Sequence, residues 1–293
     1  MLLRVIAFVS SWFKKQKRPT TVKTIREKKA FASVWGLDWT RVLVGAKWTV
    51  GAVTAWLVVS GALSLGGLLI RVSLDTWVLD MRNTFFTGLR VLGAVVVGSL
   101  WAIPLGVWIG THPQWTRRLQ PIVQITASFP YPMVFPIITA WLLKIGVGIE
   151  IGSVFLMVFG SQWYILFNVI SGATRIPKHL LEVASVFRIR GMKYWGAIIL
   201  PSIFPALLNG WITAAGGAWN ACIVSEFVQQ GSTIVLATGI GSSITTAALQ
   251  TDFPGLAAAV VVMVTTVVLV NRLLWGGLYH LAETKYRLDA VNE

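Results

Sequence analysis

Arg90 is a charged side chain placed where it could do chemistry, because it lies inside an apolar run from Asn83 to Gly110. A guanidinium offers planar, paired N–H donors to an oxyanion. If the run crosses a membrane, a charge at that depth is costly unless it is paired, hydrated or able to extend to the interface. Three interpretations follow: Arg90 accepts an anion in a cavity, pairs with Asp80 or Glu226, or extends back to the outer surface. The sequence leaves all three open.

Residues suited to catalysis or metal binding are sparse. The single cysteine, Cys222, lies in an apolar run, which excludes a disulfide framework and a cysteine-based metal site. The three histidines, at 112, 179 and 280, are too far apart to suggest a metal or haem site. The sequence has no glycine-rich phosphate loop followed by Lys and Ser or Thr, and no Ser/His/Asp or Cys/His set that one side of a membrane could hold. We therefore expect no catalytic residue, metal or cofactor, and no enzyme activity in the chain itself.

The composition is that of a membrane protein. Of 293 residues, 55% are hydrophobic and 12% are charged, and the mean hydropathy is +0.71. The net charge of +14 would suggest a nucleic-acid partner in a soluble protein. Here the Lys and Arg residues flank apolar runs, which is the pattern that orients a membrane protein, so no nucleic acid is expected.

Apolar runs predict an all-α, polytopic membrane protein with six transmembrane helices. The runs are 48–70, 83–110, 119–143, 151–174, 202–225 and 253–270. Residues 71–82 are expected to form a short outer connection, helical along the surface. The third run carries four prolines, and the fifth is rich in Gly and Ala, which lets helix backbones approach closely in lipid.

The basic residues predict the orientation. Most Lys and Arg lie before residue 48, between 175 and 193, and after 271, so these segments and both termini are expected in the cytoplasm. The domain boundaries follow as a basic tail (1–47), a transmembrane domain (48–280) and a C-terminal tail (281–293). Within the N-terminal tail, residues 2–13 could form an interfacial helix beside anionic lipid, and a disordered tail is the alternative.

A basic segment from about 175 to 201 interrupts the apolar runs. Pro177 suits the first turn of a helix, apolar residues then recur at helical spacing, and Gly191 can adopt the left-handed conformation that ends one. A second helix is expected from Met192 to Leu200, interrupted at Pro201. Two short helices joined by a tight bend suit docking into a groove of another protein.

The same segment resembles the EAA loop of binding-protein-dependent ABC importer permeases, through Glu182, Ala184, Gly191 and the Leu200–Pro201 end. The second motif position is Val183 instead of Ala, and the glycine usual six residues after the Glu is Arg188 here. The resemblance implies a type I importer permease fold and a loop that seats in an ABC ATPase subunit. The coupling residues would be Glu182, Ala184, Phe187, Arg188 and Gly191.

Further stretches are similar to the nitrate, sulfonate and taurine branch of that family, most closely to one half of a duplicated anion-type permease. These are residues 88–92, 103–106, 128–136 and 216–220 followed by Glu226. The resemblance implies an inner-membrane subunit that imports a small anion such as nitrate, a sulfonate, taurine or bicarbonate. Its partners would be ABC ATPase subunits, a second permease half, a periplasmic substrate-binding protein and membrane lipids. The translocation path would include Arg90, Gly216, Gly217, Trp219, Asn220 and Glu226.

Three alternatives remain open. The small residues of the fifth span suit either plain helix packing or a dimer seam beside the path. Residues 227–251 are expected to form an outer loop with a short helix, which either closes a gate or merely covers the surface. A secondary transporter or channel that works without an ATPase is the competing function, although such carriers tend to hold more ionisable residues near the membrane midplane.

Overall fold

The computed structural model describes residues 39–230 and 233–285, so the predicted interfacial helix at 2–13 lies outside the described part. The chain forms two compact units, residues 1–65 and 66–293. The described part of the first unit is α3 (Trp39–Leu69), whose last residues pass into the second unit. Residues 48–70 hold no charge, as expected for a helix that crosses a membrane.

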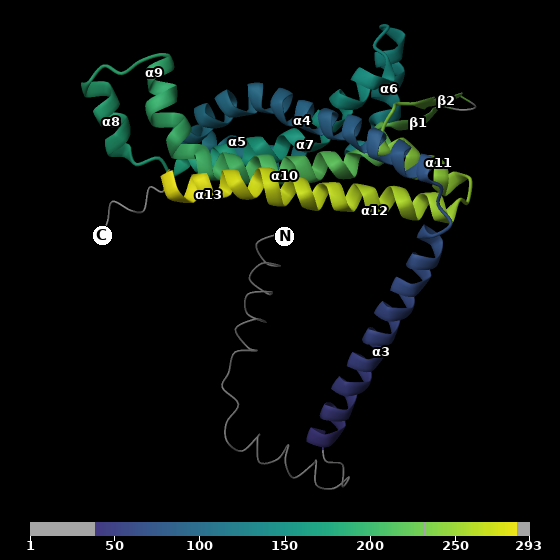
Figure 1. Ribbon diagram of the computed structural model, residues 1–293. Coiled ribbons are helices and arrows are strands. Elements are labelled where there is room, and N and C mark those ends of the chain that lie inside the picture. The colour runs from purple at the N-terminus through teal and green to yellow at the C-terminus, as the bar shows by residue number, and fades with distance from the viewer. Residues whose placement is uncertain (1–38, 231–232, 286–293) are drawn as a thin grey trace, which may run out of the picture. The chain divides into compact units, whose positions relative to one another are not determined.

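Three long helices lie side by side in the second unit and form its core (Figure 1): α4 (Leu74–Thr111), α7 (Ile149–Thr174) and α10 (Leu200–Ser225). Small residues bring their backbones together. A methyl group added to Gly106 would lie 2.7 Å from Cγ1 of Val169, and one added to Gly172 would lie 2.7 Å from Cβ of Ala206. Close backbone approach through small residues is how helices associate in lipid.

A further long apolar segment runs along α10 and α4 (Figure 1). It consists of α12 (Phe253–Val270), a π-helical turn η3 (Asn271–Trp275) and α13 (Gly276–Lys285). Ala258 and Ala259 are buried against the bundle, whereas Val264 and Val268 are exposed. The described residues thus contain five helical segments long and apolar enough to cross a membrane: 47–69, 74–111, 149–174, 192–225 and 253–282.

The third expected span is a broken helix. It consists of α5 (Pro113–Ala127), a 3₁₀ turn η1 (Tyr131–Met133) and α6 (Phe135–Lys144). Pro130 and Pro132 lie at the break, where proline removes backbone donors and disfavours helical geometry in the residue before it. Neither α5 nor α6 alone is long enough to span a bilayer.

The expected surface helix over residues 71–82 is wrong as a separate element. The Ser73 side chain caps α4 by accepting a hydrogen bond from the Thr76 amide, and the helix then continues without a break to Thr111. Nothing between Leu74 and Asn83 can end a helix, since the stretch contains neither Gly nor Pro. Only Ile70, Arg71 and Val72 lie between the end of α3 and Ser73.

The segment after α10 forms an antiparallel hairpin, β1 (Phe227–Gln230) with β2 (Thr233–Leu236), and then α11 (Ile240–Leu249). The short helix expected in this segment is confirmed, and the hairpin is an addition. At the opposite end of the long helices lie α8 (Lys178–Val186), α9 (Met192–Tyr194) and a π-helical turn η2 (Trp195–Ile199) (Figure 1). The expected interruption at Pro201 is wrong, because the wider π turn before it lets one helical segment run from Met192 to Ser225.

Candidate functional site

The bend between α8 and α9 is built by two residues with positive φ. The Ile189 amide donates to the carbonyl of Ala184 (2.8 Å) and the Arg188 amide to that of Ser185 (3.1 Å), which is the Schellman pattern that ends a helix. Arg188, at φ 53°, occupies the left-handed position where glycine is usual. Gly191 follows at φ 61° and ψ −139°, a conformation essentially restricted to glycine. The bend therefore lies at Arg188, and Gly191 sets the start of α9 instead of ending α8.

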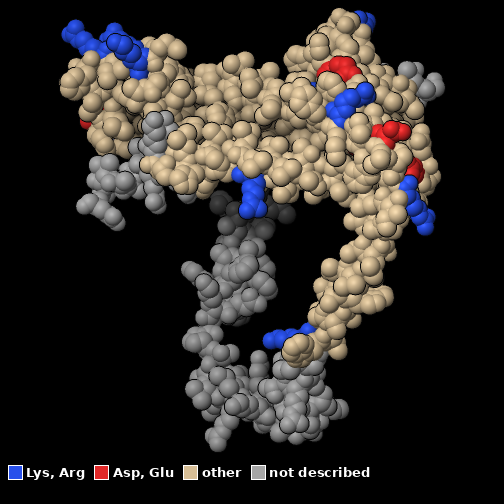
Figure 2. Space-filling model, in the orientation of Figure 1, with Lys and Arg blue, Asp and Glu red and all other residues tan. Residues whose placement is uncertain are grey.

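Apolar side chains are exposed at the tip of this bend. Val186, Phe187 and Met192 are 76%, 73% and 87% exposed, whereas Ala184 is buried inside the segment. Glu182 is exposed on α8. Figure 2 shows Lys and Arg side chains over α8 and α9, while most visible Asp and Glu side chains lie at the opposite end of the bundle, where further Lys and Arg side chains accompany them. The tip, which we define as residues 184–192, thus presents an apolar centre with a basic rim.

A buried polar network lies at the opposite end, around Arg90 and Glu226. Arg90 Nη1 donates to Glu226 Oε1 (2.9 Å) and to the carbonyl of Thr238 (2.8 Å), and Nη2 pairs with the Glu150 carboxylate. Thr87 Oγ1 donates to Glu226 Oε1 (2.8 Å), so α4 supplies two of the donors. Of the three interpretations of Arg90, the structure has the ion pair with Glu226; Asp80 is not part of it.

The same network also holds the segment that joins β2 to the start of α11, through hydrogen bonds from its backbone amides. Glu226 is fully buried and also accepts the Gly241 amide (2.8 Å), while Glu150 Oε1 accepts the amide of Thr238 (2.9 Å). A methyl group added to Gly239 would collide with the Glu226 carboxylate. We call Thr87, Arg90, Glu150, Glu226 and Thr238 the outer-end network, after the orientation that the basic residues predict. Sequence reasoning missed Thr87, Glu150 and Thr238. The available signal was the possible ion pair between Arg90 and Glu226, which indicated that a polar site could form here but not which other residues would join it.

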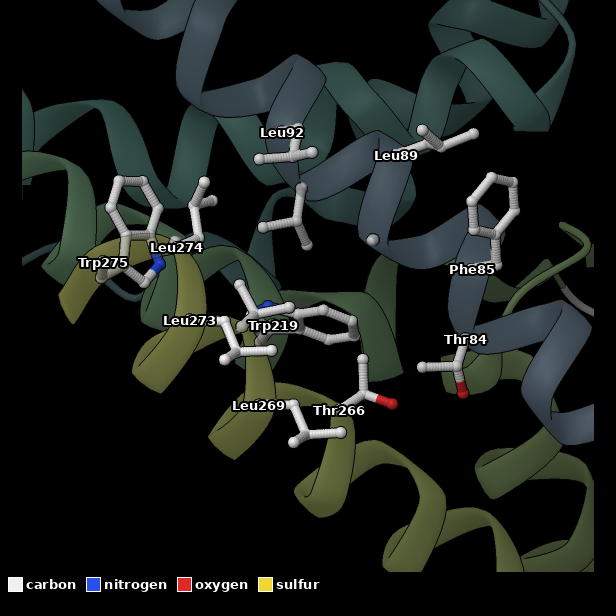
Figure 3. A pocket seen from close by; sticks show the side chains of 14 residues that line it. Thr84, Phe85, Leu89, Leu92, Trp219, Thr266, Leu269, Leu273, Leu274 and Trp275 are labelled. Carbon is white, nitrogen blue, oxygen red and sulfur yellow. The ribbon is translucent and has the colours of Figure 1, made fainter. Parts of the chain in front are cut away.

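The small-residue part of α10 has two different faces. Trp219 is buried beside Gly88 of α4 and lines an apolar cavity of about 340 Å³ between α4, α10 and the α12–η3 segment. Figure 3 shows its ring among Leu92, Leu269 and Leu273. Asn220 and Gly216 are exposed on another side of the helix. The structure therefore separates Trp219 from Asn220, which the sequence had grouped together.

Residues 102–282 match the family model of the binding-protein-dependent transport system inner membrane component, over more than half of the chain. The matched residues include the whole exposed tip and most of the outer-end network. The chain belongs to this family. The resemblance inferred from the sequence is confirmed, and so is a multi-pass inner-membrane location.

Curated relatives within the family include anion-type permeases. The chain is 31% identical over 157 residues to the bicarbonate transport system permease protein CmpB of Synechocystis sp., covering 51% of this chain and 54% of that one. It is 26% identical over 191 residues to the nitrate import permease protein NrtB of Synechococcus elongatus (59% and 67% covered). The putative aliphatic sulfonates transport permease protein SsuC of Escherichia coli is 27% identical over 204 residues (63% and 72%).

The chain spans only about half the length of several curated relatives, for example 54% of the bicarbonate permease. Among solved structures, one chain of the inward-facing MetNI methionine ABC transporter superposes with a TM-score of 0.58 at 17% identity. That match covers 72% of this chain and 99% of the other. It establishes the importer permease fold for the part of the chain that it covers.

Proposed function

We propose that the chain is the transmembrane subunit of an ATP-driven importer, with ATP hydrolysed on separate ABC ATPase subunits. One observation carries the proposal: an apolar tip, exposed and rimmed by basic residues, within the part of the chain that the family model matches. An exposed apolar patch rimmed by polar residues marks a site of interaction with another protein or with a membrane. Phe187 and Met192 would enter a groove of the ATPase, with Arg188 and Glu182 at its rim.

Ala184 and Gly191 support this interface from within. Ala184 is buried where α8 packs on the rest of the segment, and Gly191 has a backbone geometry that other residues do not adopt. Both would fix the angle of the tip without touching the partner. The coupling residues are thus divided into contacting residues (Phe187, Arg188, Glu182) and shaping residues (Ala184, Gly191).

We propose six crossings with both termini in the cytoplasm, and domain boundaries at 1–47, 48–280 and 281–293. The helices α5 and α6 in series would supply the third crossing, because together they extend from Pro113 to Lys144. The charge pattern of the sequence supports the orientation, since five Lys and Arg residues lie between 175 and 193, in the segment that holds α8 and α9, which would then face the cytoplasm.

The solute is proposed to be a small anion of the bicarbonate, nitrate or sulfonate kind, delivered by a periplasmic binding protein. Support comes from the relatives, whose names record those solutes. The sequence contains one copy of the coupling loop, so a second permease half, identical or not, would complete the path. ATP-driven closure of the ATPases would move the two tips and shift the spans between two states.

Reconstitution tests this proposal. The chain is purified in mild detergent with any bound ATPase and placed in proteoliposomes with its binding protein, and ATP hydrolysis is measured with bicarbonate, nitrate or a short alkanesulfonate. We expect a nucleotide-binding subunit to co-purify, and one of these anions with the binding protein to stimulate hydrolysis. Uptake without ATP, and no ATPase in the purified complex, would instead establish the secondary-transporter alternative.

A further inference from the structure

The exposed face of α10 is polar where the exposed face of its neighbour α4 is apolar. Between Leu207 and Cys222 the exposed residues of α10 are Asn209, Thr213, Gly216 and Asn220. Their spacing of four, three and four residues puts them on one side of the helix. On α4, by contrast, the exposed residues of the middle turns include Leu92, Val96 and Leu100. We call the four α10 residues the polar stripe.

The stripe lies within a membrane span and extends over a substantial part of it. The span containing α10 is Met192–Ser225, and Asn209 to Asn220 covers about 16 Å at 1.5 Å per residue. Carboxamides inside a membrane are costly against lipid and face protein or water instead. The carboxamides of Asn209 and Asn220 are exposed and make no hydrogen bond among residues 39–230 and 233–285, so they are available to water, a solute or another chain.

The second long helix, α7, borders the stripe with two more polar side chains. Tyr164 lies against Gly217, since a methyl group there would be 2.9 Å from the Tyr164 ring, and Asn168 lies against Gly210 at 3.1 Å by the same measure. Tyr164 is 43% exposed. A methyl group on Gly216 would meet nothing within 4 Å, so there is open space above the stripe. The surface therefore combines amide and hydroxyl groups with room for a small solute.

The surface carries no cation. Neither α7 nor α10 contains Lys or Arg between their ends at 149–174 and 200–225. The nearby guanidinium of Arg90 is buried and already makes four hydrogen bonds, to Glu226, Thr238 and Glu150. Neutral amide and hydroxyl donors carry no net positive charge, so they lack the Coulomb attraction that a guanidinium or ammonium group adds to its hydrogen bond with an anion. An anion would thus be held more weakly than at a cationic site, as passage requires.

We propose that the polar stripe, with Tyr164 and Asn168, is the wall along which the solute passes, and that it takes a small oxyanion through neutral hydrogen-bond donors. A second permease half supplies the opposite wall. This inference rests on the proposed function and deepens it. Because amides and hydroxyls also bind neutral and cationic groups, the stripe does not select by charge, and that selection occurs before the solute reaches it.

Cysteine accessibility tests the stripe directly. The chain contains one cysteine, the buried Cys222, so Cys222→Ala provides a background without thiols in this subunit. Asn209→Cys and Asn220→Cys are then treated with an anionic and a cationic methanethiosulfonate reagent in the reconstituted transporter, with and without ATP. Val96→Cys is the matched control. The Arg90–Glu226 ion pair aligns α4 with α10. Val96 lies six residues after Arg90 and Asn220 lies six residues before Glu226, so both are displaced equally toward the tip and lie at a similar depth in the membrane.

Both stripe positions are expected to react with both reagents in at least one nucleotide state, at rates within about threefold of each other, while Val96→Cys stays unmodified. No reaction in any state would overturn the inference, since the stripe would then pack against protein or lipid. An anionic reagent that reacts more than about tenfold faster would overturn the claim of a neutral path.

Transport gives a second readout. Asn220→Leu is expected to lower uptake about tenfold, a loss of about 1.4 kcal/mol, while Asn220→Gln retains most of it. Binding-protein-stimulated ATP hydrolysis in the Cys222→Ala background reports separately on the proposed function. If hydrolysis is stimulated and Asn220→Leu imports normally, the stripe assignment fails and the importer assignment stands. If hydrolysis is not stimulated even in the background, the importer assignment itself fails.

Discussion

The two ends of the helix bundle differ in how their energetically unfavourable groups are satisfied, the buried charges at one end and the exposed apolar side chains at the other. At the outer end the charges of Arg90 and Glu226 are buried and fully hydrogen-bonded by the protein itself. At the other end Phe187 and Met192 expose apolar surface that nothing in the described part of the subunit covers. A group satisfied internally stabilises the fold, whereas one left unsatisfied indicates a partner. The difference predicts that outer-end variants lose folded protein and that tip variants lose coupling.

Gly239→Val should have the largest effect on the amount of folded protein. A side chain there collides with the Glu226 carboxylate and would displace it from Thr87 and Arg90. Size-exclusion chromatography of the detergent-solubilised chain should show little monodisperse protein. Gly148→Val is the control, because a side chain at Gly148 meets nothing within 4 Å. Equal yields of the two variants would contradict the tight packing of the outer-end network.

Arg90→Gln should be the next most damaging change. It leaves the buried Glu226 carboxylate without its cation, and breaking such a buried pair costs roughly 3–5 kcal/mol. The melting temperature of the variant in detergent should fall sharply. Adding Glu226→Gln should recover much of the loss, since the double variant buries no unpaired charge. A double variant no more stable than Arg90→Gln would mean that the two side chains are not energetically coupled.

Gly191→Val should spare folding and reduce coupling. Valine cannot adopt the backbone conformation of Gly191, so the start of α9 and the angle of the tip must change. We expect ATP hydrolysis stimulated by the binding protein to fall about fivefold or more, within the range of coupling free energies. Gly196→Val in the neighbouring π turn is the control, because a methyl group added to Gly196 would meet nothing within 4 Å. Loss of folded protein in Gly191→Val alone would make the segment structural instead.

Deletion of residues 1–18 should have the smallest effect. The basic run 14–18 is expected to contact anionic lipid, where each Lys or Arg contributes about 1 kcal/mol of membrane attraction. The remaining spans anchor the chain without it, so stimulated hydrolysis should stay within about twofold of the intact protein. A correctly assembled but inactive deletion would show a function beyond anchoring.

The sequence predicts the long helices well, because an uncharged run of about 20 residues has few alternatives to a membrane span. It fails where local signals compete. Pro130 and Pro132 lie where the third run divides into α5 and α6, and the Ser73 cap begins α4 within a stretch expected to be separate. Arg188 took the left-handed position expected of Gly191, because the Schellman hydrogen bonds outweigh the cost of positive φ.

The candidate site is predictable only in part. Periodicity and motif spacing identify Glu182, Ala184 and Phe187, because these lie close together in one segment. The outer-end network joins Arg90 to Thr238, 148 residues away, through a hairpin that no local pattern predicts. That Trp219 and Asn220 face different sides of α10 can be known only once α4 is placed, because the indole ring of Trp219 packs beside Gly88 of that helix. Contacts between distant segments are therefore what the structure adds.

The most direct test of the coupling claim is the stimulation of ATP hydrolysis in the reconstituted Phe187→Asp transporter. Ile145→Asp is the control, because Ile145 is 54% exposed but lies in the turn after α6, outside the tip and outside the proposed crossings. A charge at Phe187 should abolish stimulation by the loaded binding protein while the chain remains folded, and Ile145→Asp should keep it. Full stimulation in Phe187→Asp would contradict the assignment of the tip as the ATPase-docking surface.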